Sequence, residues 1–450
     1  MSRAIRPCDS VDAFSEHQRK REKLIADLAA ARASGSAVGL AKSTSNLFRH
    51  RDGAAKRKID VRCFNRALAI DPTRSIGEVE GMTTYADFVD AALEHHCLPA
   101  VVPQLKTITV GGAVSGIGIE SSSFRFGLVH ETVSEMDVLL GDGTVVTCSR
   151  TRHPDLFFGF PNSYGTLGYA LRVAVKLIPA KRYVHLEHER FASPGRFFER
   201  IGALCAGGGI DYLDGVVFNG GEMYATTGRF CDDAPRTHDY TYMSVYYKSI
   251  RRLTEDWLTA KDYIWRWDTD WFWCSKHFYV QNPVVRFAAT KWALNSRNYQ
   301  RIMRLANRVR PDSGGEESVI QDVDIPVENA EEFLRFLLAE IGITPIWICP
   351  FRSYDRTASY DLYTFDPDIV YINFGFWDTI ATTHEDGYFN RKIEVKAREL
   401  CGKKGLYSSA YYDEETFWEI YNGPRYRELK RKYDPGGVFP DLYAKCVQRR

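Results

Sequence analysis

The sequence predicts an α+β protein built from two domains, and three observations lead to this prediction. The chain has 450 residues, and at roughly 100–200 residues per domain it is long enough for more than one. In some segments apolar residues recur with helical spacing, and in others they alternate as in a half-buried strand. After about residue 181 the character of the chain changes, because helical and strand segments follow one another irregularly and tryptophan becomes more frequent.

Composition and charge exclude several classes of protein. Lys and Arg number 59 and Asp and Glu number 58, so the net charge of +1 offers no bulk attraction to nucleic acid. The ten cysteines include no CxxC pair and no zinc-ligand spacing, which fits reduced thiols in the cytoplasm. No apolar stretch approaches the roughly 18–20 residues of a spanning helix. Aromatic residues, at 13%, suggest large apolar surfaces in a core or in a pocket for a hydrophobic ligand.

The first part of the chain carries clear signals for individual elements. Residues 14–32 are charged and Ala-rich and predict a helix, whose basic run at 19–23 is either a solvated face or a contact for anionic lipid. Thr84 is expected to cap a helix, with Asp87 three residues on in a variant capping box. Residues 38–48 predict a short strand, a Ser/Thr/Asn loop and an apolar exit. Strands are predicted at 67–71, 76–79 and 171–178, and a hairpin is predicted around the Gly-Asp-Gly turn at 141–143.

In the second part the same patterns predict strands at 215–218, 242–247, 320–325, 346–348 and 370–376. Helices are predicted at 331–340 and 414–433. His185 and His188 lie on a further predicted strand, where a separation of three residues turns them to opposite faces. We therefore expect no metal site.

Residues 107–127 are the most unusual segment, with five glycines and four serines in 21 residues. Glycine lets backbone N–H groups crowd around an anion, and serine hydroxyls add further donors, so the segment suits a pyrophosphate. A Gly-rich turn between strands is the structural alternative. The spacing is neither GxGxxG nor a Walker loop, which disfavours a Rossmann nicotinamide domain and a P-loop NTPase.

Three loops, in this order, resemble the flavin-binding domain of the vanillyl-alcohol oxidase and p-cresol methylhydroxylase superfamily: residues 42–46, 109–112 and 164–168. The stretch Gly-Ile-Gly-Ile-Glu-Ser-Ser-Ser at 116–123 is similar to the Δ24-sterol reductases, as are residues 178–181 and the aromatic tail at 406–443. Residues 102–107, 161–164 and 265–274 extend the resemblance to bacterial reductases that convert a 10-methylene fatty acyl chain to the 10-methyl chain. Together these segments cover nearly the whole chain after residue 38.

The resemblance implies a bound FAD, held in a first domain over residues 1–180. A second, antiparallel-sheet cap domain over 181–400 is expected to hold the substrate, and residues 401–450 to return to the FAD domain. Many relatives attach the flavin covalently through a His in the first loop; this chain lacks that His, so we expect non-covalent FAD. The expected cofactor-binding residues are Lys42, Ser43, Thr44, Ser45, Asn46, Thr109, Gly111, Gly112, Gly116, Gly118, Glu120, Ser121, Ser122, Ser123, Gly165, Thr166 and Gly168.

Reduction of an unactivated C=C bond needs a proton donor as well as a hydride. Asp268 and Asp270 lie among four tryptophans, where burial would raise a carboxyl pKa and keep it protonated. Their structural alternative is a pair of surface or capping carboxylates beside a Trp-rich core. Tyr411 and Tyr412 are rival donors, unless they serve in core packing. Glu120 either holds the cofactor or has a purely structural role.

The resemblance implies an FAD-dependent reductase of a C=C bond in a lipid chain, with a 10-methylene fatty acyl group of a phospholipid as substrate and NADPH as electron donor. Alternatives are the reverse desaturation of a methyl-branched acyl chain, a Δ24-sterol-reductase-like activity, and a flavoprotein partner of a lipid methyltransferase. The expected location is the cytoplasm, with peripheral contact to the inner face of the membrane through basic stretches at 19–23, 56–58 and 449–450.

Overall fold

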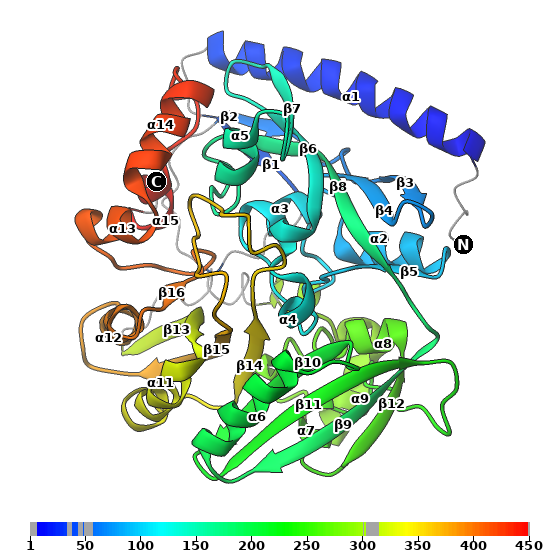
Figure 1. Ribbon diagram of the computed structural model, residues 1–450, viewed down its shortest axis with the longest axis vertical. Helices are drawn as coiled ribbons and strands as arrows, with labels where there is room; N and C mark the ends of the chain where they lie inside the picture. Colours follow the sequence, from blue (N-terminus) through cyan, green and yellow to red (C-terminus); the bar gives the residue numbers. More distant parts are fainter. Residues whose placement is uncertain are drawn as a thin grey trace.

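The computed structural model describes residues 7–33, 38–43, 48, 57–299, 301–302 and 315–448. Two separate β-sheets divide the molecule into an upper and a lower half in Figure 1, each with its own helices. The change from one sheet to the other falls between residues 179 and 183. The predicted α+β class with a distinct antiparallel-sheet cap is confirmed.

The upper half is organised around a six-stranded antiparallel sheet of order β3-β4-β8-β6-β7, with β5 paired to β8. Along β8 the predicted alternation is confirmed, because Leu171, Val173, Val175 and Leu177 are buried. A separate parallel pair joins β1 and β2. The strands are β1 (Val38–Ala41), β2 (Arg57–Asp60), β3 (Ala67–Asp71), β4 (Ile76–Glu80), β5 (Cys97–Pro99), β6 (Val133–Leu139), β7 (Val145–Ser149) and β8 (Tyr169–Pro179).

The helices of this half are short apart from the first. They are α1 (Pro7–Ala33), α2 (Tyr85–Leu93), α3 (Val110–Ser115), α4 (Ser123–Phe126), the 3-10 turn η1 (Val129–Thr132) and α5 (Pro154–Gly159). α1 runs along the edge of the domain in Figure 1 and buries Leu24 and Leu28. Lys20, in the basic run of α1, pairs with the buried carboxylate of Glu80 at 3.0 Å. Thr84 caps α2 as predicted, because its side chain accepts a hydrogen bond from the backbone N–H of Asp87.

The lower half, here called the cap, contains an eight-stranded antiparallel sheet of order β12-β9-β11-β10-β14-β15-β13-β16. Every neighbouring pair in it is antiparallel. Its strands are β9 (Tyr183–Phe191), β10 (Tyr212–Asn219), β11 (Glu222–Cys231), β12 (Glu255–Thr259), β13 (Glu316–Pro326), β14 (Ile346–Phe351), β15 (Tyr371–Ala381) and β16 (Lys403–Lys404). His185 stacks on Trp257 while His188 bonds Thr226, so the two histidines diverge as expected.

Helices cover both faces of the cap sheet. They are α6 (Pro194–Ala206), α7 (Tyr246–Ser249), α8 (Ala260–Ile264), η2 (Cys274–Phe278), α9 (Pro283–Ala293), η3 (Val327–Asn329), α11 (Ala330–Phe336), η4 (Leu337–Ile341) and α12 (Tyr388–Glu399). The strand predicted at 242–247 is wrong. That segment forms turns and α7, because its aromatic residues pack inward; Tyr246 meets the edge of Trp267 at 5.0 Å.

The C-terminal segment crosses back to the upper half, where its helices lie beside α5 (Figure 1). The single helix predicted at 414–433 is instead two, α13 (Glu414–Ile420) and α14 (Gly423–Tyr433), because Asn422 takes φ 53° between them and caps the second. After α14 comes α15 (Leu442–Cys446). Lys430 and Lys445 tie this segment to the carbonyl oxygens of Thr166 and Tyr164 at 2.7 and 2.6 Å.

Two findings concern membrane spans and metal sites in the described part of the chain. No helix within the described ranges combines the length and apolarity needed to cross a bilayer. Among the same residues, no three His, Cys, Asp or Glu side chains gather as a metal site would require.

Candidate active site

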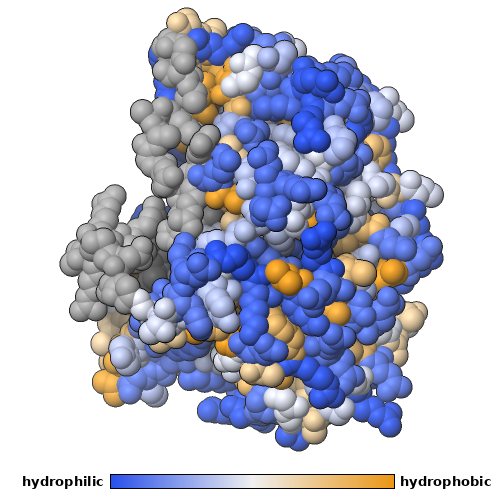
Figure 2. All heavy atoms as spheres, turned by 90° about the vertical axis from the view of Figure 1, so that its left-hand side faces the viewer, coloured by the Kyte–Doolittle hydropathy of each residue, from blue (hydrophilic) through white to orange (hydrophobic). Residues whose placement is uncertain are grey.

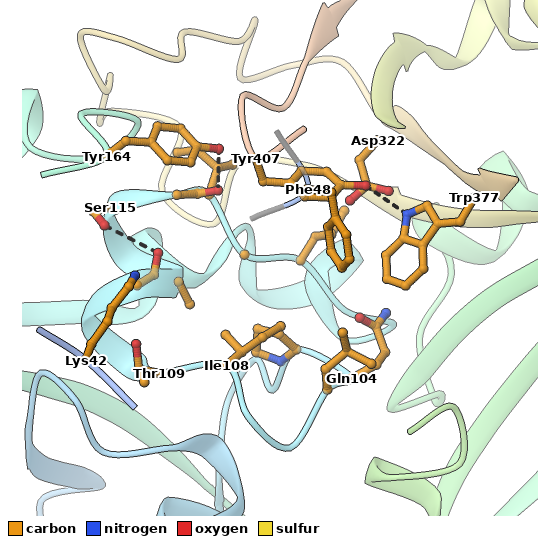
Figure 3. Close-up of a pocket in the computed structure, with 18 residues that line it drawn as sticks. Lys42, Phe48, Gln104, Ile108, Thr109, Ser115, Tyr164, Asp322, Trp377 and Tyr407 are labelled. Carbon is orange, nitrogen blue, oxygen red and sulfur yellow. Dashed lines mark hydrogen bonds between the residues drawn. The ribbon is translucent and has the colours of Figure 1, made fainter. Parts of the chain in front are cut away.

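A cavity of about 180 Å³ lies where the Gly/Ser-rich segment of the upper half meets the cap sheet (Figure 3). Its walls come from four parts of the chain that are far apart in sequence. They are Lys42 and Phe48; residues 103–105, 108–109, 112–113 and 115–119; Tyr164; and Asp322, Trp377 and Tyr407. The cavity is therefore bounded by both halves and by the C-terminal segment.

One end of the cavity is polar. Lys42, Thr109 and Ser115 are drawn together in Figure 3, on the side away from the cap residues. Thr109 begins α3, and its side chain makes no capping hydrogen bond to the helix. Gly112 presents backbone rather than a side chain to the same space. A cation, a hydroxyl and exposed backbone are the groups that a phosphate or ribityl chain requires.

The opposite end combines one carboxyl group with aromatic rings. Trp377 Nε1 donates to the hydroxyl of Tyr407 at 2.8 Å, and that hydroxyl is hydrogen bonded to Asp322. Burial raises the pKa of Asp322 to about 8, and the charge of Asp324 adds to the rise, whereas the Tyr407 hydrogen bond opposes it. Partial burial therefore favours the protonated form of Asp322 near neutral pH.

Asp324 stands two residues further along β13 and has separate partners. Its carboxylate accepts hydrogen bonds from Tyr363 at 2.8 Å and Asn373 at 2.7 Å. Burial raises its pKa to about 6, while these bonds and the charge of Lys403 hold it down. Asp324 does not line the cavity, so it acts on Asp322 only through its charge.

A narrow side chamber of about 30 Å³ continues from the main cavity into the cap. Four residues border both spaces: Gln104, Ile119, Asp322 and Trp377. The chamber is otherwise walled by Phe272, Trp273, Trp347 and Gly375. Since a cavity needs about 10–15 Å³ to hold one water molecule, this chamber admits about two atoms of that size in a largely aromatic surround.

The residues present fit an FAD molecule. Gln104 Nε2 is buried, lines both spaces and has no hydrogen-bond partner among the described residues. A buried donor without an acceptor costs free energy, so Gln104 Nε2 indicates that a bound ligand places a hydrogen-bond acceptor in the cavity. Lys42, Thr109 and Ser115 would hold the phosphate and ribityl part, and Gln104 a ring oxygen or nitrogen.

Five of the predicted cofactor residues line the cavity: Lys42, Thr109, Gly112, Gly116 and Gly118. Ser43 is exposed next to Lys42 and does not line it. The predicted residues Thr44, Ser45 and Asn46 lie outside the described residues. Direct contact of any of these with FAD stays a prediction.

The run from Glu120 to Ser123 joins the two halves of the molecule instead of lining the cavity. Glu120 pairs with Arg266 at 2.9 Å, and burial raises its pKa while the Arg266 charge opposes the rise. Ser121 bonds the hydroxyl of Tyr263 at 2.9 Å. Ser122 donates to the carbonyl of Ala100, and Ser123 accepts from the amide of Glu120. These contacts support a structural role for Glu120.

The remaining predicted cofactor residues make packing and turn contacts. The amide of Gly111 donates to the carbonyl of Gly81 at 2.9 Å. Gly165 and Gly168 take positive φ in the turn before β8, where Thr166 donates to the carbonyl of Ser163. Within this third loop only Tyr164 lines the cavity. Its hydroxyl donates a hydrogen bond to the carbonyl oxygen of Gly116 at 3.1 Å.

The structure does not bring the predicted proton donors to the cavity. Asp270 is buried and forms a two-pronged ion pair with Arg286 at 2.7 and 2.9 Å. Asp268 accepts hydrogen bonds from Ser296 at 2.6 Å and the Lys106 amide at 3.0 Å. Burial raises the pKa of Asp268, against the Lys106 charge and these bonds. The expected burial among tryptophans is present, yet neither carboxyl borders the cavity.

The predicted rival donors also lie elsewhere. The hydroxyl of Tyr411 is 3.3 Å from Asp386, and the ring of Tyr412 is buried against Tyr421. Sequence reasoning missed Asp322, Gln104 and Trp377 as site residues. The sequence contains one indication of Asp322. Asp322 and Asp324 stand at alternate positions of a strand with apolar residues between them, so their carboxyl groups face the same side, and burying two such groups costs free energy.

Comparison with known proteins agrees with this geometry. Residues 18–149 match a family model described as an FAD binding domain. Δ24-sterol reductase of Homo sapiens is 26% identical over 402 residues, which cover 85% of this chain and 76% of the relative. The Pisum sativum Δ24-sterol reductase is 24% identical over 434 residues, covering 87% and 76%. Cytokinin dehydrogenase 6 of Oryza sativa is 37% identical over 141 residues, 30% of this chain and 27% of that protein.

The cavity geometry and the matched domain thus lead to one conclusion about the chemistry. The chain carries an FAD-binding domain of the p-cresol methylhydroxylase and vanillyl-alcohol oxidase type, and over most of its length it is a distant relative of the Δ24-sterol reductases. It is an FAD-dependent oxidoreductase.

Proposed function

We propose that this protein reduces a carbon–carbon double bond in a lipid chain, and that its substrate is a 10-methylene fatty acyl group of a phospholipid. NADPH is the proposed electron donor. The observation that carries the proposal is Asp322, a protonated acid on the wall shared by the main cavity and the aromatic side chamber. A reductase of an unactivated alkene requires such an acid in an apolar setting.

The chemistry divides between cofactor and protein. Bound reduced FAD would supply a hydride to one alkene carbon. Asp322 supplies the proton to the other, so that the π bond is lost and two C–H bonds form. For a terminal methylene, protonation of the CH₂ carbon places positive charge on the tertiary carbon, which accepts the hydride. Trp377 holds the Tyr407 hydroxyl by a hydrogen bond, and that hydroxyl would orient the Asp322 carboxyl.

The side chamber bears on the choice of substrate. With about 30 Å³ between Phe272, Trp273 and Trp347, the chamber offers an apolar space for about two atoms, such as the carbons of a terminal alkene. The second candidate substrate is a sterol, which the similarity to Δ24-sterol reductases supports. Desaturation of a methyl-branched chain would need a base at this position, and a protonated Asp322 favours reduction. A lipid methyltransferase remains a proposed partner, to be tested by co-purification.

The first prediction tests this assignment through the two half-reactions. The purified FAD protein is reduced anaerobically with NADPH and then mixed with detergent-dispersed 10-methylene lipid or with a Δ24-sterol. We expect reoxidation by the acyl lipid. Asp322→Asn should retain FAD and its reduction by NADPH, but slow reoxidation by about 10²–10⁴-fold, the usual contribution of a general acid.

Asp324→Asn is the matched control, because it removes a buried carboxyl from the same strand but outside the cavity. It should stay within a few-fold of wild type at pH 6. Above about pH 8 the wild-type reoxidation rate should fall as Asp322 ionises, and Asp324→Asn should move that break to lower pH. Equal reoxidation by Asp322→Asn and wild type would remove Asp322 from the mechanism. Reoxidation by the sterol alone would favour the second substrate.

A further inference from the structure

Large exposed hydrophobic side chains are concentrated on one part of the cap. Nine such residues are exposed in the described part of the chain, and five of them lie on or beside α9: Met243, Tyr279, Val284, Val285 and Phe287. We call these five the α9 patch. The face of the molecule in Figure 2 is mainly hydrophilic, with scattered hydrophobic residues. Single exposed hydrophobic residues are ordinary, whereas a concentration of them marks an interaction surface.

α9, which is kinked at Thr290, is anchored through Arg286 and leaves apolar side chains exposed. Arg286 is buried and its guanidinium binds Asp270, so the inner side of the helix is fixed to the Trp-rich segment. Arg286 also donates to the carbonyl of Tyr242, and the Tyr242 hydroxyl donates to the carbonyl of Phe287 at 2.9 Å. These bonds place Met243 beside α9. Val284 and Phe287, exposed by 76% and 71%, point away from this anchor.

The Lys, Arg, Asp and Glu residues around α9 in the sequence are all basic. Residues 271–311 contain eight Lys and Arg and no Asp or Glu, in a chain where 58 of 450 residues are acidic. Among the described residues of this stretch, Lys291, Arg297 and Arg301 are exposed. Lys291 lies 3.5 Å from the exposed carboxylate of Asp239, so Arg297 and Arg301 are the basic residues that a membrane contact would use. Exposed apolar side chains beside such basic residues are the pattern of a helix that lies in the interface of an anionic membrane.

The patch is also connected to the cavity. The ring of Phe278, next to Tyr279, stacks on Tyr299 at 5.2 Å, and Tyr299 stacks on Trp271 at 6.4 Å. Trp271 contacts Phe48 and Trp377, which line the cavity, at 5.7 and 6.2 Å. A continuous column of aromatic rings therefore runs from the surface beside α9 to the cavity wall.

We infer that the α9 patch docks the protein on an anionic lipid bilayer, with Val284 and Phe287 inserted between the acyl chains and the exposed basic residues at the headgroups. The inference rests on the proposed function for its purpose, because a phospholipid acyl chain must leave a bilayer to reach Asp322. It locates the membrane contact on the cap and not on the basic run of α1, where Lys20 is already paired with Glu80.

The test is flotation of the FAD-loaded full-length protein with vesicles of equimolar phosphatidylglycerol and phosphatidylcholine, compared with phosphatidylcholine alone. The wild type should float with the anionic vesicles. Val284→Ser/Phe287→Ser should lower the bound fraction at limiting lipid by at least about tenfold, because each side chain loses apolar burial in the bilayer. Arg297→Glu/Arg301→Glu should abolish the preference for anionic vesicles.

Two controls isolate the patch. Val395→Ser removes a comparably exposed hydrophobic residue from α12, and Arg19→Glu/Lys23→Glu reverses charge on α1. Both should float like the wild type. Loss of binding in either control equal to that of the α9 variants, unchanged binding by the α9 variants, or no flotation of the wild type would each overturn the inference. In the last case a protein partner becomes the occupant to test.

Reoxidation by detergent-dispersed lipid separates this inference from the proposed function. The Val284→Ser/Phe287→Ser variant should be reoxidised at the wild-type rate in detergent and at least about tenfold more slowly by vesicles. If no lipid in detergent reoxidises the wild type, the proposed function fails, while flotation still decides the docking surface. Equal rates on vesicles for the variant and the wild type would count against the docking surface alone.

Discussion

At the scale of single residues, Asp322 should set a pH dependence of stability. Its pKa is raised to about 8 in the folded protein from an ordinary value of 3.8. Between those values the folded state holds a proton that the unfolded state has released, so the free energy of unfolding falls as pH rises. One proton corresponds to about 1.4 kcal/mol per pH unit.

The second prediction follows from this sign. Asp322→Asn removes the ionisable group, so its unfolding free energy relative to wild type should increase steadily from pH 5 to pH 8. Urea unfolding at several pH values measures the difference, and the pH-independent part of the substitution cancels. A difference that is flat with pH would mean that Asp322 is ionised in the folded protein at neutral pH.

The third prediction concerns Gly112. A Cβ there would lie 2.8 Å from Thr109 Oγ1, and among the described residues beyond its neighbours and its own helix backbone no other atom lies within 4 Å, so a side chain would project into the cavity. Gly112→Val should therefore fold but lose FAD, since the branched carbon stands where the cofactor meets the backbone. Flavin absorbance after desalting reports the loss, and circular dichroism reports the fold. Gly202→Ala, at an open position on α6, should retain FAD. Full flavin content in Gly112→Val would move the cofactor away from α3.

At the scale of elements, α9 depends on one buried ion pair. Asp270→Asn would leave the Arg286 guanidinium buried without its counter-charge, which typically costs about 3–5 kcal/mol. The fourth prediction is a loss of stability of this size, measured by urea unfolding. Asp268→Asn is the contrast, because an amide oxygen can still accept from Ser296 and the Lys106 amide. Reoxidation by lipid in detergent should stay near the wild-type rate in Asp268→Asn; a loss of 10²-fold or more would restore Asp268 as a proton donor.

The same elements show which parts of the site a sequence can reveal. The Gly/Ser-rich segment was recognisable because glycine and serine have local reasons to be there, and Thr109, Gly112, Gly116 and Gly118 do line the cavity. Burial of Asp268 and Asp270 followed from their tryptophan neighbours. Their partners did not, since periodicity carries no information about which distant side chain, such as Arg286, will meet a carboxylate.

At the scale of the whole molecule, the site exists only because distant segments meet. Gln104 and Asp322 border the same spaces although more than two hundred residues separate them. Local patterns predicted most of the strands of both sheets, because alternation is a property of each strand alone. They gave no means to tell which face of β13 turns toward the Gly/Ser-rich segment, so Asp322 was not among the predicted proton donors.

The two halves are joined at a buried cluster of charges. The Arg266 guanidinium, from the cap, binds Glu120 of the upper half at 2.9 Å and Asp214 of β10 at 2.7 Å. All three side chains are at most 3% exposed. Nearby, the amide of Leu213 donates to the carbonyl of Ser121 at 2.8 Å. The cluster therefore fixes the Gly/Ser-rich segment against the cap sheet that carries Asp322.

The fifth prediction ranks two substitutions in this cluster. Arg266→Met leaves two buried carboxylates facing one another and should cost about 3–5 kcal/mol, with easier proteolysis between β8 and β9. Glu120→Gln should cost less than about 1 kcal/mol, because Arg266 keeps Asp214 and Glu120 Oε2 has no hydrogen-bond partner among the described residues. Urea unfolding and limited proteolysis measure both effects. If Glu120→Gln proves as costly as Arg266→Met, the charge on Glu120 itself holds the halves together, and its pKa, raised by burial, must still leave it ionised at neutral pH.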